Sequence, residues 1–115
     1  MSFDQRGQRV NYQYNAAGNI NFGQVNNQAD LVDELEKLKS EVARAGDAQV
    51  IEAELVTDVQ YQLQKAVEQA KKPEPNKNVV VEHLNKAKDF IKGVVEAGGI
   101  VTAIVKAVEL VQQLF

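Results

Sequence analysis

The chain of 115 residues contains no cysteine and a single histidine. The missing cysteines exclude disulfide bonds, thiolate metal sites and thiol nucleophiles. The histidine, His83, stands near an expected helix start, and the only serines, Ser2 and Ser40, lie far from it in the sequence. Nothing favours a serine–histidine–acid site, so we expect His83 to be an ordinary surface or half-buried residue. The sequence predicts no enzyme, no catalytic residue and no cofactor.

Patterns for binding metal, nucleotide or nucleic acid are also missing. The chain has no Glu-x-x-His pair of the kind found in di-metal helical bundles. Gly18 and Gly23 have the glycine spacing of a phosphate loop, but Gln24-Val25 stand where the lysine and the hydroxyl residue are needed. With 13 basic against 16 acidic residues, the chain has no basic block for nucleic-acid phosphates. We therefore expect neither a metal ion nor a nucleic-acid partner.

The first ten residues lack the apolar run of a signal peptide, which predicts a cytoplasmic protein. The length suffices for one domain with a modest core. We divide the chain into a polar β-hairpin segment for self-association, residues 1–27, and a helical bundle domain, residues 28–115.

The stretch NYQYNAAGNINFG, residues 11–23, is uncharged and rich in asparagine. Apolar and polar residues alternate from Val10 and, after Ala16-Ala17-Gly18, alternate again around Ile20 and Phe22. Such alternation with aromatic and β-branched residues predicts two strands, and Gly18 suits a hairpin turn because it tolerates positive φ. An isolated hairpin is only marginally stable in water, so these strands need a further surface.

Two surfaces can complete the strands. Their apolar side chains can dock on the helices, or the strands can pair with a second copy, within or between chains. We favour self-association, because no lysine or proline guards the strand edges and Asn and Gln side chains form ladders between stacked identical strands. The predicted apolar contacts are Val10, Tyr12, Tyr14, Ile20 and Phe22, and the predicted polar ladder is Asn11, Gln13, Asn15, Asn19 and Asn21.

The run QRVNYQYNAAGNINFGQV resembles the short Gly/Asn/Gln-rich, amyloid-like signalling leaders of bacterial conflict and programmed-death proteins associated with NLR-like STAND NTPases. The resemblance covers about residues 3–25. It implies homotypic templating with a protein that carries a similar strand motif, and it names no catalytic residue. The helical remainder would then be a signalling adaptor or a small membrane-active effector.

Three helices are expected after the strands, so the fold class is mainly α with a small N-terminal β element. Asn27 or Asp30 can cap the first helix, and its other faces are polar and include Glu34 and Glu41. The expected apolar seams step by four and three residues. They are Leu31, Leu35, Leu38, Val42 and Ala45 in the first helix and Ile51, Leu55, Val59, Leu63 and Val67 in the second.

The helix ends are predicted from caps and breakers. Gly46 suits the end of the first helix and Asp47 the cap of the second, which we expect over residues 48–72. Pro73 and Pro75 stop the second helix, and Asn78 caps the third. The resulting architecture is a three-helix bundle preceded by a β-hairpin or by strands shared between subunits.

The third helix is expected to be long. Its apolar residues keep a four-three rhythm through Gly98-Gly99, which predicts one helix that can bend at the glycine pair. The expected seam is Val80, Leu84, Ala87, Ile91, Val94, Gly98, Val101, Val105 and Val108. Charged residues such as Lys106 and Glu109 interrupt the apolar run, so a stable span is not expected. The alternative function is a membrane-perturbing effector that uses residues 93–115. The predicted helix contact or membrane face comprises Gly98, Gly99, Val101, Ile104, Val105 and Val108.

Overall fold

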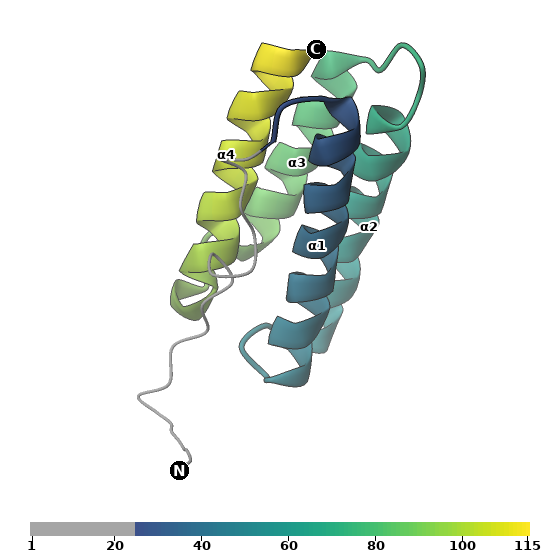
Figure 1. Cartoon of the computed structure of the whole chain (residues 1–115). Coiled ribbons are helices and arrows are strands. Elements are labelled where there is room, and N and C mark those ends of the chain that lie inside the picture. Colours follow the sequence, from purple (N-terminus) through teal and green to yellow (C-terminus); the bar gives the residue numbers. More distant parts are fainter. Residues whose placement is uncertain (1–24) are drawn as a thin grey trace.

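A computed structural model describes residues 25–115, which form a bundle of four helices and contain no strand (Figure 1). The helices are α1 (Gln28–Asp47), α2 (Ala53–Ala70), α3 (Lys77–Ile91) and α4 (Gly98–Leu114), and the short 3-10 helix η3 (Val95–Ala97) precedes α4. Each helix runs antiparallel to the one before it, and α1 packs against both α2 and α4. The mainly helical class is confirmed, whereas the predicted β-hairpin lies outside the described residues.

The prediction of three helices with one long last helix is wrong. α3 ends at Ile91, and the chain reverses before α4 (Figure 1). Val94 is extended, with φ −92° and ψ 105°, and its amide donates a hydrogen bond to the carbonyl of Ile91 at 2.9 Å. A continuous helix over residues 77–114 would be roughly 55 Å long. It would leave the apolar residues of its second half in water, and the reversal buries them instead.

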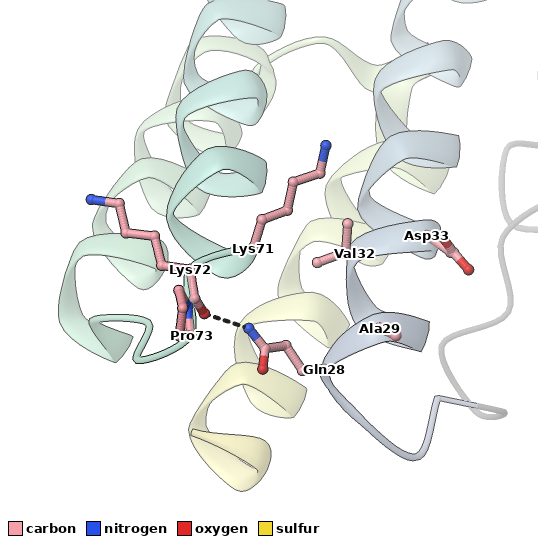
Figure 2. A pocket seen from close by; sticks show the side chains of 7 residues that line it. All are labelled: Gln28, Ala29, Val32, Asp33, Lys71, Lys72 and Pro73. Atoms are coloured by element: carbon pink, nitrogen blue, oxygen red, sulfur yellow. Dashed lines mark hydrogen bonds between the residues drawn. The ribbon is translucent and has the colours of Figure 1, made fainter.

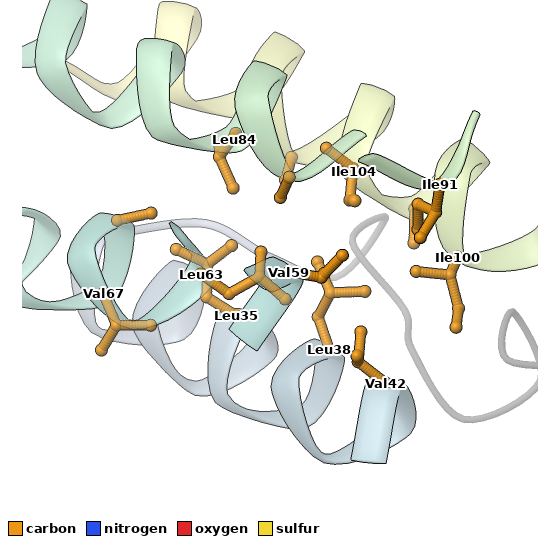
Figure 3. Close-up of a cluster of buried hydrophobic side chains, with 14 of the residues drawn as sticks. Leu35, Leu38, Val42, Val59, Leu63, Val67, Leu84, Ile91, Ile100 and Ile104 are labelled. Carbon is orange, nitrogen blue, oxygen red and sulfur yellow. The ribbon is translucent and has the colours of Figure 1, made fainter. Parts of the chain in front are cut away.

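The core is formed by the predicted seams of the first two helices and by the first half of the third. Figure 3 shows Leu35 and Leu38 of α1 with Leu63 of α2 on one side of this core, and Leu84 and Ile104 on the other. The fully buried seam residues are Leu31, Leu35, Leu38, Val42, Ala45, Val59, Leu63, Val67, Val80, Leu84, Ala87 and Ile91. In α4 the predicted phase is wrong. The buried residues there are Ile100, Ala103, Ile104, Ala107 and Val111.

Asparagine side chains cap two of the helices. The side chain of Asn27 accepts a hydrogen bond from the amide of Asp30 at 2.8 Å, so the first of the two predicted caps of α1 is confirmed. Asn76 caps α3 by accepting from the amide of Val79 at 3.2 Å, and the predicted cap Asn78 lies inside the helix. The connection between α2 and α3 contains both prolines, as predicted.

The end of α1 differs from the prediction. Gly46 is still helical, and a Cβ atom placed on it would lie 2.6 Å from Cγ2 of Val56, so this glycine permits a close contact with α2. The left-handed conformation that glycine usually adopts after a helix is taken by Gln49, with φ 63°. Its amide donates to Gly46 at 3.0 Å and the amide of Val50 donates to Ala45 at 2.9 Å. These two bonds form a Schellman motif.

Replacing Gln49 with glycine is expected to stabilise the bundle. A non-glycine residue in the left-handed region costs about 1–2 kcal/mol, of which the greater unfolded-state entropy of glycine offsets a part. We therefore expect Gln49→Gly to raise the free energy of unfolding by about 1 kcal/mol in urea titrations. The control Ser40→Gly, at an exposed position inside α1, should lower it by roughly 0.5 kcal/mol. Equal losses in both variants would contradict strain at Gln49.

Candidate functional site

The strands predicted for self-association, residues 10–22, lie outside the described residues. The described chain begins with Val25, which is 8% exposed and belongs to the hydrophobic core. Figure 1 shows that the dark blue stretch before α1 crosses from the start of α1 toward α4. Residues 1–24, hereafter the N-terminal segment, directly precede this stretch in the chain.

The residues predicted for a helix contact or membrane face do not share one surface. Ile104 is fully buried in the core, whereas its neighbour Val105 is 40% exposed. Val101 and Val108 are partly buried and pack against the core. A Cβ atom on Gly98 would have no atom of another helix within 4 Å, so no helix approaches closely at this glycine in the described part of the chain. The set therefore divides between core and surface.

Two carboxylates of α1 are buried, although the sequence suggested a solvated polar face. Glu34 is 8% exposed and Glu41 is 5% exposed. Lys37 donates a hydrogen bond to Glu34 at 2.8 Å, and Arg44 donates one to Glu41 at 2.8 Å. The hydrogen bond and the negative charge of Glu34 raise the pKa of Lys37 above its usual value. We call Glu34 and Glu41 the acidic edge.

The acidic edge lies on the flank of α1 that is turned away from α2. The opposite flank contacts α2, because Lys39 donates through Nζ to Oε1 of Gln64 and accepts at its carbonyl from Nε2 of Gln60 at 3.2 Å. At about 3.6 residues per turn, Glu34 and Glu41 lie on the other side of the buried leucine seam. Since the second neighbour of α1 is α4, the acidic edge faces α4.

An open depression of about 390 Å³ lies where α1 begins and α2 ends (Figure 2). The amide of Gln28 donates to the carbonyl oxygens of Ala70 and, at 2.8 Å, of Lys72. Ala70 is the last residue of α2, and Lys72 lies two residues beyond it. The last carbonyls of a helix have no partner within the helix, so Gln28 of α1 serves as a cap for the end of α2. The lining residues are Gln28, Ala29, Val32, Asp33, Lys71, Lys72 and Pro73.

Among the described residues, the single histidine contacts a neighbouring helix. His83 is half-buried, and its Nδ1 lies 2.7 Å from Oε1 of Gln62 on α2. Residues 25–115 hold no group of three His, Asp or Glu side chains able to bind a metal ion. Within the same range, no helix has both the length and the apolar character needed to cross a membrane.

Comparisons of the chain with protein-family models, with curated proteins and with solved structures found no match. Function is therefore inferred from the residues and their arrangement.

Proposed function

We propose that this protein is a non-enzymatic interaction and signalling module that self-associates through residues 10–22. The observation that supports this most is the composition of that segment. No charged residue stands between Val10 and Val25, and neither lysine nor proline guards a strand edge. Tyr12 and Phe22 are among its apolar contacts, and its asparagines and glutamine form the polar ladder.

The bundle is suited to the role of a scaffold for this segment. Its core is aliphatic, and its leucine and isoleucine side chains are packed against one another. The N-terminal segment directly precedes Val25, which is buried in the core of the bundle. The partners in this proposal are further copies of the chain and a protein that carries a similar strand motif, as the resemblance to signalling leaders implies.

Light scattering at increasing concentration tests the self-association. The full chain is expected to be oligomeric at tens of micromolar, which corresponds to roughly −6 to −7 kcal/mol. Gln13→Lys and Asn19→Lys each place like charges between stacked strands, so each should raise the dissociation constant at least about tenfold. Gln112→Lys adds the same charge on exposed α4 and should change nothing. A chain starting at Val25, which retains the buried valine, should be monomeric. A full chain that stays monomeric would refute the proposal.

A second candidate function, a membrane-perturbing effector, is favoured by the composition of residues 93–115. Val95 is 87% exposed and Val105 is 40% exposed, so apolar surface is present at the turn before α4 and along this helix. The other apolar side of α4, including Ile104, is buried against the bundle. Insertion of α4 into lipid would therefore require it to leave the other helices.

A further inference from the structure

We propose that the N-terminal segment docks on the acidic edge of its own bundle and that this docking competes with self-association. The regulatory part rests on the proposed function, since it concerns the same segment. The occupant of the acidic edge is the chain's own residues 1–24, held by Arg6 and Arg9. The docked protein is the resting form, and release of the segment allows copies to pair.

Charge complementarity favours this occupant. Arg6 and Arg9 outnumber Asp4 in the N-terminal segment, whereas the whole chain has a formal charge of −3. Two arginines of a basic segment thus match two buried carboxylates of an acidic bundle. A carboxylate accepts several hydrogen bonds at once, so a guanidinium group can share Glu34 with Lys37, or Glu41 with Arg44.

The spacing of the charges is compatible with simultaneous contact. Glu34 and Glu41 are two helical turns apart, or about 10 Å along α1. An extended chain also covers about 10 Å between Arg6 and Arg9. Gly7 lies between the two arginines and gives the backbone the freedom to turn both side chains to one face.

The point of attachment places the segment beside its target. Val25 is buried in the core, and the stretch that contains it, residues 25–27, runs from the start of α1 toward α4, the helix that the acidic edge faces (Figure 1). Measured along α1, Glu41 is about 20 Å beyond Gln28, the first residue of the helix. The chain between Arg9 and Val25 can span roughly 50 Å when extended, so the arginines can reach both carboxylates with enough chain left for a turn at Gly18.

Docking lowers the tendency to assemble because the same side chains make the contact with the bundle and the contact with another copy of the chain. The aromatic residues next to the arginines, such as Tyr12, either cover the bundle or pair with another copy. When only a fraction of the segments is free, the apparent dissociation constant of assembly rises by the inverse of that fraction.

Paramagnetic broadening in nuclear magnetic resonance spectra tests the docking on the full chain. Because the chain has no cysteine, Gln8→Cys provides a single position for a nitroxide label. At a concentration below assembly, we expect strong broadening of amide signals around Glu34 and Glu41, and little around Tyr61 on the exposed surface of α2. In a mixture of spin-labelled protein without isotopes and isotope-labelled protein without a spin label, only contacts between different chains can broaden the signals. Docking within one chain should therefore give no broadening in this mixture. Broadening that persists in the mixture, lies on α2, or is absent would overturn the proposal.

Charge removal tests the competition. Arg6→Gln with Arg9→Gln, which alters no residue of the bundle, should abolish the broadening and lower the concentration of half-assembly about tenfold. Glu34→Gln with Glu41→Gln should also abolish the broadening and lower the concentration of half-assembly. Circular dichroism checks that this variant is folded. The control Glu36→Gln with Glu68→Gln removes two exposed carboxylates and should change neither reading. An unchanged assembly concentration in the arginine variant would refute the competition.

The two proposals can fail separately. A chain that is monomeric at every concentration but shows broadening at the acidic edge would refute self-association and retain the docking. Assembly through residues 10–22 without that broadening would retain self-association and refute the docking.

Discussion

Replacing Leu38 with alanine is expected to lower the free energy of unfolding by roughly 2–4 kcal/mol. Leu38 is fully buried and lies in the middle of the α1 seam, where the core is formed by several helices (Figure 3). The substitution removes buried methyl groups and leaves a cavity that neighbours held by other helices cannot fill completely. Leu35→Ala, at an equally buried position, should have an effect of the same size.

Urea titration measures this loss through a shift of the midpoint at an unchanged slope. The control Val105→Ala removes methyl groups from a side chain that is 40% exposed and should cost less than about 1 kcal/mol. Near-neutral values for both leucine variants would mean that the seam faces solvent or another chain, and would contradict the packed bundle.

The seams of α1, α2 and α3 could be predicted because each helix has one apolar stripe. Leu31 to Ala45 repeat every three or four residues, and this spacing alone determines which side of α1 is buried. The apolar spacing cannot show where the chain reverses between α3 and α4, because the same spacing continues on both sides of the reversal. Ile104 rather than Val105 is buried because α4 returns against α3 and α1, and that contact is between segments distant in sequence.

The buried carboxylates were missed for a related reason. Glu34 directly precedes Leu35, and Glu41 directly precedes Val42, so both lie beside the apolar seam and not opposite to it. A helical wheel shows this position, and it could have predicted that the two carboxylates are buried. The sequence of α1 does not tell which flank faces α4. Gln49 was missed as a cap because glycine is the usual residue there, and Gly46 stood close by.

The neighbouring residues Ile104 and Val105 separate a core role of α4 from a membrane role. Ile104→Asp places a carboxylate in an aliphatic core, and we expect a loss of about 4–5 kcal/mol or more, which is much of the stability of a typical domain. Val105→Asp places the same charge at a partly exposed position and should cost about 1 kcal/mol or less. Thermal and urea unfolding followed by circular dichroism measures both losses.

Dye release from anionic vesicles then decides between the two candidate functions. The resting protein should release no dye, because Ile104 and the other buried residues of α4 complete the bundle. An effector would bind more strongly as anionic lipid increases, since Lys92 and Lys106 near such a surface contribute about 1 kcal/mol each. Ile104→Asp cannot serve as the test, because its unfolding would expose the core to lipid. Strong leakage by the natural chain that Val105→Asp abolishes without loss of helicity would establish membrane perturbation in place of the interaction module.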